Sequence, residues 1–359
     1  KVMCREIELG VASAHLALNE STLDLSAIDH ERFGVEFGAN QMCSPPDVLA
    51  PGAFACADED HEFQFERWGE EGLLQMEPLW LLKYLPNMPA CHIGIHADAR
   101  GPNNSLTMAE ASGNNVIGEA FRIISRGRAD VMLCGATGTR IHAVKAMHAA
   151  LWDQLADYGD EADPATWSRP FDATRRGQVI GEGACTFILE TEDHAVARGA
   201  DILGTVLGVG STCVIDRDGK PNLRQALVNA MKTALRDADL SPADVGHIHA
   251  HGLGEVDADI QEAGAIADVF GAASTTIPVT SFKGQVGNSG AACGVLELAA
   301  SLLGLKHGMI PATVNYSTPD ERCPLNVVHG EHAPAANKVF LNVNVTSQGQ
   351  AAAVVVCGA

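Results

Sequence analysis

One stretch constrains the fold of this 359-residue chain more than any other: residues 101–138, GPNNSLTMAEASGNNVIGEAFRIISRGRADVMLCGATG. Within it, residues 105–109 favour a short strand, and residues 110–113 form a tight turn of small residues around one glutamate. Residues 114–126 predict a helix, because their apolar side chains recur on one helical face. Residues 129–134 predict a buried strand. This order is the geometry of a nucleophile elbow, whose turn lifts one side chain to the mouth of a pocket; an ordinary α/β crossover has the same order.

The turn reads Ala109-Glu110-Ala111-Ser112-Gly113. The stretch resembles the nucleophile region of the elongating β-ketoacyl-[acyl carrier protein] synthases, condensing enzymes of the thiolase fold, in which this turn reads Ala-Cys-Ala-Ser-Gly. The position of the acyl-accepting cysteine is therefore Glu110. The resemblance implies an α/β, thiolase-like fold of five layers (helix, sheet, helix, sheet, helix) with two pseudo-repeated halves.

Other motifs extend this resemblance over nearly the whole chain, among them GPN at residues 101–103 and RPFD at residues 169–172. Residues 112–130 and 289–308 occupy equivalent places, as an internal duplication produces. We expect an N-terminal half at residues 1–192, with the elbow, and a C-terminal half at residues 193–359, with the histidine, lysine and asparagine motifs. The family's opening strand and its Gly-rich turn are absent from this sequence.

The remaining secondary structure is predicted from periodicity and small-residue turns. Residues 41–75 are expected to be irregular. We expect helices at residues 1–20, 142–158, 223–238, 257–270 and 295–306, and strands at residues 33–38, 184–190, 202–210, 247–251, 277–281, 338–345 and 351–356.

Condensing enzymes of this type use a cysteine and two histidines. The cysteine thiolate takes the acyl group, and the two histidines bind the malonyl thioester and stabilise its enolate. By resemblance, His251 matches the first histidine and Lys283 the supporting lysine, whereas the second histidine is replaced by Asn288. An asparagine still donates to an oxyanion, so decarboxylation is not excluded. Condensation through a cysteine is excluded by Glu110 unless another thiol substitutes; Cys293 lies in the second turn, but the resemblance implies no elbow-tip position for it.

Acidic positions downstream of His251 are retained as supporting residues, Asp259 and Glu262. Leu253 and Glu255 replace two threonines of the family and alter the wall of the pantetheine channel.

The C-terminal segment NVNVTSQGQAAAV aligns with the family's glycine-flanked phenylalanine gate of the acyl pocket. Thr346 and Ser347 stand there as candidate substrate-binding residues, and Asn344 and Gln348 are the other residues that replace the family's Phe-Gly-Phe-Gly-Gly character. Without the aromatic ring and the glycine hinges, we do not expect a mobile acyl gate.

Glu110 lies at a predicted helix N-terminus, where a carboxylate is favoured by typically about 0.3–1 kcal/mol. We expect Lys283 or His251 to pair with it. Alternatively, Glu110 mimics the acyl-thioester carbonyl, as glutamine does in decarboxylating relatives. A carboxylate there would repel the carboxylate of malonate unless one of them is protonated, which weighs against decarboxylation.

The net charge of −21 argues against nucleic acid and anionic membranes as partners. An acidic carrier protein then needs a local basic patch. The available arginines are Arg122, Arg126 and Arg128, with Arg175 and Arg176.

No window of the sequence is long and apolar enough for a membrane span. The ten scattered cysteines show no ligand spacing and are read as reduced thiols of a cytoplasmic protein. His247, His249 and His251 alternate along one strand face, but no carboxylate or second cluster at a fitting spacing completes a metal site. We expect neither a metal nor a cofactor.

The resemblance leaves three functions open. The first is a ketosynthase-like subunit that cannot condense alone and, like a chain-length factor, pairs with a cysteine-bearing synthase. The second is a malonyl-carrier-protein decarboxylase or other acyl-thioester enzyme using His251, Asn288 and Lys283. The third is a non-catalytic module that binds acyl chains or acyl carrier protein. The family's dimers imply a homodimer or heterodimer through the strand at residues 104–109.

Overall fold

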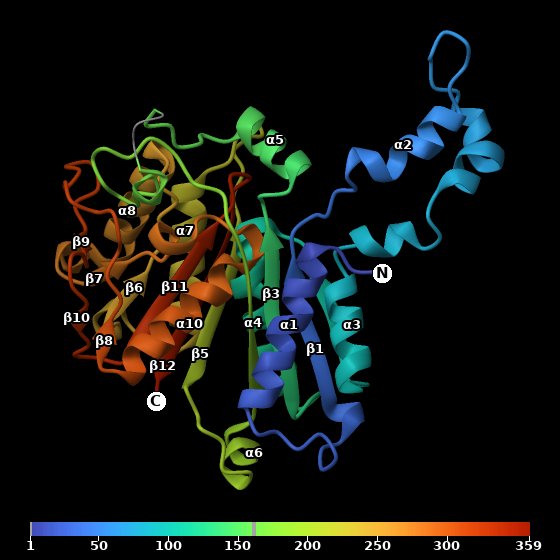
Figure 1. Ribbon diagram of the computed structural model, residues 1–359. Coiled ribbons are helices and arrows are strands. Elements are labelled where there is room, and N and C mark those ends of the chain that lie inside the picture. Colours follow the sequence, from blue (N-terminus) through green and yellow to red (C-terminus); the bar gives the residue numbers. More distant parts are fainter. Residues whose placement is uncertain (1, 160–162) are drawn as a thin grey trace.

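The computed structural model describes residues 2–159 and 163–359 (Figure 1). Its helices are α1 (Arg5–Glu20), α2 (Pro46–Ala55), α3 (Met88–Ala97), α4 (Ser112–Ser125), α5 (Ala143–Trp152), α6 (Glu192–Ala197), α7 (Leu223–Asp237), α8 (Val256–Phe270), α9 (Lys283–Val286) and α10 (Cys293–Lys306). Its strands are β1 (Phe33–Ala39), β2 (Asn103–Leu106), β3 (Val131–Thr139), β4 (Glu182–Glu190), β5 (Gly204–Cys213), β6 (His247–His249), β7 (Pro278–Thr280), β8 (Met309–Ile310), β9 (Asn326–Val327), β10 (Ala333–Pro334), β11 (Val339–Val345) and β12 (Gln350–Gly358).

Two mixed sheets form the body of the molecule. The first has the order β2-β1-β3-β4, and the second has the order β5-β12-β11-β6-β7-β9. In both, parallel strands are followed by an antiparallel partner, β4 beside β3 and β12 beside β11. The sheets differ at that partner: β12 also pairs with β5 and is buried, whereas β4 ends the described sheet and is only half-buried.

Helices α4 and α10 lie between the two sheets, where their apolar residues share one core with β3 and β12. On the outer face of the first sheet, α1 and α3 pack against β1. On the outer face of the second sheet, α7 and α8 pack over β6 and β11. The resulting order of helix, sheet, helix, sheet, helix is visible in Figure 1 and confirms the predicted thiolase-like fold.

The two central helices begin against each other, and glycine is needed at the contact. A Cβ on Gly113 would lie 2.9 Å from the backbone nitrogen of Val295, and one on Gly294 would lie 2.9 Å from the backbone nitrogen of Asn114. No larger residue fits at such distances. Each helix is preceded by one 3₁₀ turn, at Ala109–Ala111 and Gly290–Ala292, so the predicted equivalence of the two turns is confirmed.

Several expected boundaries are corrected by the structure. Strand β2 ends at Leu106 rather than residue 109, because Ala109 turns into the left-handed region with φ of 44°. Helix α5 ends at Trp152 rather than residue 158, because the backbone at Asp153 is extended. Residues 41–75 are not irregular throughout, since they contain α2 and a series of single helical turns.

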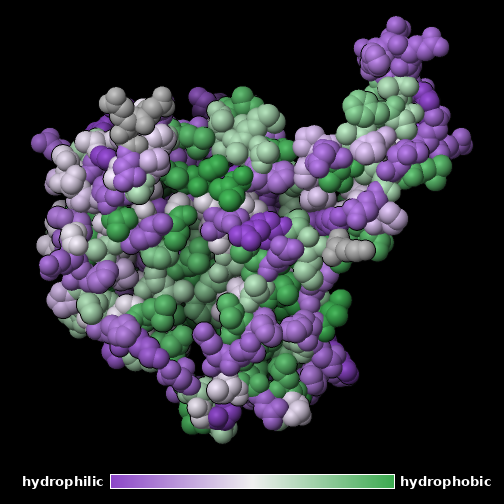
Figure 2. Space-filling model, viewed as in Figure 1, coloured by the Kyte–Doolittle hydropathy of each residue, from purple (hydrophilic) through white to green (hydrophobic). Residues whose placement is uncertain are grey.

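The segment from α2 to residue 84 extends away from the body as an arm, which stands apart in Figure 1 and in Figure 2. Phe54, Phe65 and Leu74 on this arm are each 78% exposed. None of the helices in residues 2–159 and 163–359 has the length and apolar character that crossing a membrane requires.

Candidate functional site

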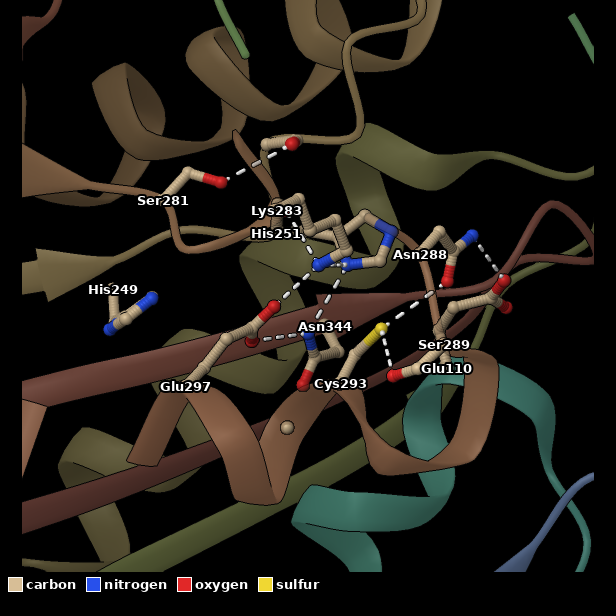
Figure 3. Close-up of polar contacts among 12 residues, drawn as sticks. Glu110, His249, His251, Ser281, Lys283, Asn288, Ser289, Cys293, Glu297 and Asn344 are labelled. Carbon is tan, nitrogen blue, oxygen red and sulfur yellow. Dashed lines mark hydrogen bonds and ion pairs between the residues drawn. The ribbon is translucent and has the colours of Figure 1, made fainter. Parts of the chain in front are cut away.

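Glu110 lies at the tip of the first turn and faces the second turn. Asn288 Nδ2 donates to Glu110 Oε1 at 3.0 Å (Figure 3). Arg140 Nη1 lies 3.5 Å from the same oxygen. The expectation that Lys283 or His251 pairs with Glu110 is wrong, because both of those side chains are engaged with other partners. Arg140 follows β3 and is the cation that compensates the glutamate.

Gln178 connects the residues around Glu110. Its Oε1 accepts hydrogen bonds from Arg140 Nη1 at 2.8 Å and from Asn288 Nδ2 at 2.7 Å, and its Nε2 donates to Glu255 at 2.8 Å. Arg140 also forms an ion pair with Asp153, and this pair links the residues that precede and follow α5. The Asn288 amide nitrogen has two N–H groups, and both are used within this cluster.

His251 and Lys283 belong to a second, more deeply buried network (Figure 3). Lys283 Nζ lies 2.5 Å from Glu297 Oε1, 2.7 Å from the carbonyl oxygen of His251 and 3.1 Å from His251 Nδ1. Asn344 Nδ2 lies 2.8 Å from Glu297 Oε2 and 3.1 Å from His251 Nδ1. Burial would lower the pKa of Lys283, but the nearby carboxylate of Glu297 raises it above its ordinary value.

The contacts of His251 define its tautomer. Nδ1 faces the ammonium of Lys283 and the amide N–H₂ of Asn344, so it accepts and the ring proton lies on Nε2. Burial, with the charge of Lys283, lowers the pKa of His251 well below its ordinary value, which keeps the ring neutral. Nε2 is buried without a hydrogen-bond partner in the described chain. Such an N–H can stabilise a developing oxyanion.

The two supporting acidic residues hold the loop that follows His251. The carboxylate of Glu262 accepts from the backbone N–H groups of His251 at 2.7 Å and Gly252 at 2.8 Å. Burial raises the pKa of Glu262 to about 8. Asp259 accepts from the backbone N–H of Gly254 at 3.1 Å, and burial raises its pKa to about 6.

The four candidate residues of the channel and the gate lie in two places. Leu253 and Glu255 are half-buried in the loop beyond His251, and Glu255 faces Gln178. Thr346 is buried in the β11–β12 turn, where its backbone N–H donates to Gln350. Ser347 is exposed in the same turn.

Cys293 approaches the second turn without the environment of a nucleophile. Its Sγ lies 3.2 Å from Asn288 Oδ1 and 3.5 Å from Ser289 Oγ. Burial raises the pKa of Cys293, which favours the unreactive thiol over the thiolate.

His247 and His249 do not join the site. Both are buried and share one hydroxyl, that of Ser301, at 3.0 and 2.8 Å. Burial lowers the pKa of both rings, to about 3 for His247. Within the described ranges, no group of histidine, cysteine and carboxylate side chains has the geometry of a metal site.

The predicted basic patch is only partly present. Arg175 is buried, with Nη1 2.7 Å from Asp320 and Nε 3.2 Å from Asp259, so it is structural rather than a surface residue. Arg126 and Arg128 are exposed at the end of α4, and Arg176 is exposed near Gln178.

The sequence analysis missed three residues of the site, Arg140, Gln178 and Glu297, and placed Asn344 in the altered gate rather than beside His251. The sequence around Asn344 does carry a signal. Asn344 stands between two valines in a predicted buried strand, and a buried amide needs a hydrogen-bond partner inside the protein. Glu297 lies on an otherwise apolar helix and needs a cation. No local signal marks Arg140 or Gln178, because both reach the site from segments distant in sequence.

A cavity of about 360 Å³ lies on the other side of residues 139–141. Its wall includes Met42, Tyr84, Ile141 and Lys145, and neither Glu110 nor His251 lines it.

Family models match both halves of the chain. The model for the N-terminal domain of β-ketoacyl synthases matches residues 1–195, and the model for the C-terminal domain matches residues 203–317. The chain is 34% identical to the ketoacyl synthase alpha subunit of the tetracenomycin polyketide synthase of Streptomyces glaucescens, over 90% of this chain and 74% of that protein. It is 31% identical to 3-oxoacyl-[acyl-carrier-protein] synthase 2 of Staphylococcus aureus, over 92% of this chain and 78% of that protein.

Solved structures agree. The ketosynthase of a type II polyketide synthase in complex with its acyl carrier protein superposes with a TM-score of 0.87 at 25% identity, covering 100% of this chain and 86% of that one. The ishigamide ketosynthase/chain length factor superposes with a TM-score of 0.83 at 25% identity, covering 99% of this chain and 82% of that one. With the fold, both family models and these relatives in agreement, this chain belongs to the β-ketoacyl synthase family.

Proposed function

We propose that this chain is a ketosynthase-like subunit of fatty-acid or polyketide-type biosynthesis that does not condense through a cysteine. In this role it pairs, like a chain-length factor, with a cysteine-bearing synthase. One observation carries the proposal: the side chain of Glu110 stands at the acyl-accepting position and is held there by Asn288 and Arg140. A carboxylate that accepted the acyl group would form a mixed anhydride rather than the thioester that a cysteine forms, and its contacts with Arg140 and Asn288 further reduce its nucleophilicity.

The surface supports a role in an assembly. Strand β2 is the edge of its sheet, and its first two residues, Asn103 and Asn104, are exposed. The arm presents Phe54 and Phe65 to solvent, and Trp152 of α5 is 83% exposed. Exposed aromatic side chains on an arm that projects from the body favour an interaction site there. The matching structure of a ketosynthase and chain length factor supports a second subunit as the partner. We place this assembly in the cytoplasm.

Mass spectrometry after incubation with malonyl- and acyl-carrier protein tests the retired nucleophile. We expect the wild-type chain to form no acyl adduct and to release no carbon dioxide. In Glu110→Cys, the new thiol lies beside Arg140 at a helix N-terminus, which lowers its pKa and favours the thiolate. We therefore expect this variant to gain one acyl group, and to gain it equally when Cys293→Ser is added. Acylation of the wild-type chain at Cys293 would contradict the proposal.

Co-expression with a cysteine-bearing synthase tests the pairing. We expect a stable complex on size-exclusion chromatography with light scattering, and its loss in the double variant Phe65→Asp/Leu74→Asp. Arg126→Asp, on the exposed end of α4 away from the arm, is the control and should leave the complex intact. A homodimer that forms to the exclusion of the synthase contradicts the heterodimer.

A decarboxylase is the second candidate, because one observation favours it: the buried Nε2–H of His251 has no described partner. Against it, Asn288 already gives both amide N–H groups to Glu110 and Gln178. Carbon dioxide release by the wild-type chain that collapses in His251→Ala would make this candidate the function.

A further inference from the structure

The arm, residues 46–84, is a folded unit with a small core of its own. A Cβ on Gly52 would lie 2.8 Å from the ring of Trp68, and one on Gly72 would lie 2.5 Å from the same ring. The ring centroid of Phe63 lies 6.1 Å from that of Trp68. The side chains on the surface of the arm are therefore presented by a packed unit, and ordering them on binding costs little conformational entropy.

The arm is more acidic than the rest of the chain. It contains nine of the 45 acidic residues but two of the 24 basic residues. Both basic side chains are neutralised within the arm, because Arg67 pairs with Glu71 and Lys83 pairs with Glu77. Five exposed carboxylates of the arm form no ion pair with any described residue: Glu59, Asp60, Glu62, Glu66 and Glu70. The surface of the arm therefore carries uncompensated negative charge.

Exposed apolar side chains lie among these carboxylates. Phe63, 49% exposed, follows Glu62, and Phe65, 78% exposed, precedes Glu66. Figure 2 shows hydrophobic and hydrophilic residues mixed over the arm. A partner that covers the phenylalanines comes close to the carboxylates, well inside the screening length of about 8 Å at physiological salt. The charge of the partner's facing surface therefore decides how well it fits.

A second copy of this chain fits this surface poorly. Acidic residues outnumber basic ones outside the arm as well as within it. In a symmetric dimer the same patch of each copy contributes to the interface, so the arm of one copy meets either the acidic arm or the acidic body of the other. Like charges that face each other across an interface weaken it, and they weaken it more as the salt concentration falls.

We propose that the arm selects the partner of this chain by charge: it opposes the pairing of two copies and favours a subunit whose facing surface is basic around an apolar patch. Specific interfaces commonly combine such repulsion of a wrong partner with attraction of the right one. Lysine and arginine side chains at the rim of the partner's patch compensate the unpaired carboxylates of the arm. The identity of the partner as a cysteine-bearing synthase rests on the proposed function, whereas the effect of the arm on self-pairing does not.

Sedimentation velocity of the full chain over a range of salt concentrations tests the repulsion. We expect the dissociation constant of the wild-type homodimer to fall at least about tenfold between about 50 mM and about 500 mM salt, because salt screens the charges of the arm. The test variant neutralises four carboxylates of the arm: Glu59→Gln/Asp60→Asn/Glu62→Gln/Glu66→Gln. The control variant neutralises four exposed carboxylates outside the arm: Glu20→Gln/Glu192→Gln/Asp193→Asn/Glu331→Gln.

At low salt the test variant should dimerise at least about tenfold more tightly than wild type, and its response to salt should stay below about twofold. The control variant should behave as wild type. A wild-type homodimer that weakens as salt rises overturns the proposal, as does a test variant that dimerises no more tightly than the control. If the test variant does not fold, the double variant Glu62→Gln/Glu66→Gln replaces it, with an expected gain of at least about threefold.

The complex with a synthase from the co-expression experiment should respond to salt in the opposite direction. Its dissociation constant should rise at least about tenfold over the same salt range, and also in the test variant at low salt. A complex whose affinity changes with neither overturns the basic partner surface. If no synthase is recovered, the proposed pairing fails, while the self-association measurement still decides whether the arm opposes self-pairing.

Discussion

The two turns that meet at the centre of the molecule differ in what surrounds them. Around the first, Glu110 is partly exposed and contacts Arg140 and the amide of Asn288, and Asn288 in turn donates to Gln178. Around the second, His251, Lys283 and Glu297 are buried and bonded to one another. The C-terminal half thus presents a buried, neutral imidazole whose Nε2 has no described partner, while the position that aligns with the family's cysteine carries a charged pair.

The two clusters differ in how far each member depends on the others. The buried network needs every member, because each leaves a partner without compensation when it is removed. In the Glu110 cluster, Arg140 has other partners besides Glu110, because it also binds Asp153 and Gln178. Variants in the two clusters should therefore differ sharply in their cost.

The largest effect is expected at the buried ion pair. Glu297→Ala leaves the Lys283 ammonium buried without its carboxylate, and breaking such a pair lowers the free energy of unfolding by about 3–5 kcal/mol. Urea unfolding followed by circular dichroism measures this loss. The double variant Lys283→Met/Glu297→Leu removes both charges and should recover most of it; a single variant as stable as wild type would mean that the pair contributes nothing.

Sequence reasoning reached the fold and the positions of Glu110, His251, Lys283 and Asn288, because these residues lie in local motifs with small-residue turns. It failed for the partner of Glu110. Arg140 lies 30 positions from Glu110 in the sequence, and its approach depends on how β3 and α5 are placed. The same limit explains Arg175, which the local sequence leaves on the surface but which pairs in the structure with Asp259 of α8 and with Asp320 in the segment before β9.

The second prediction compares how a buried carboxyl group in each half makes the stability of the protein depend on pH. Burial and the charge of Glu119 raise the pKa of Glu36 on β1 to about 7, and its Oε2 has no hydrogen bond in the described chain. An unfolded glutamate titrates near about 4.3, so the native state holds the proton longer, and stability falls as the pH rises between these values. Glu36→Gln should therefore raise the free energy of unfolding near about pH 8, by roughly 2 kcal/mol, and change it little near about pH 5.

Glu262→Gln is the matched variant in the C-terminal half. Both oxygens of Glu262 accept backbone N–H groups, from His251 and Gly252, so an amide nitrogen in place of one oxygen meets a donor. This substitution should lower stability by about 1–3 kcal/mol, although the pKa of Glu262 is also raised. Thermal melts across this pH range measure both variants, and an equal response of the two would remove the distinction between the halves.

The smallest effect on stability is expected at Glu110 itself. Glu110→Gln keeps an oxygen for Asn288, and Arg140 keeps its ion pair with Asp153, so the cost should stay below about 1 kcal/mol. Arg140→Gln is the contrast, because it leaves two carboxylates without their cation and should cost about 2 kcal/mol.

The chemistry of Glu110→Gln is more informative than its stability. Without the negative charge that repels malonate, the intact His251 site should release carbon dioxide from malonyl-carrier protein, whereas wild type should release none. An inert Glu110→Gln would mean that the C-terminal network serves only the stability of the fold.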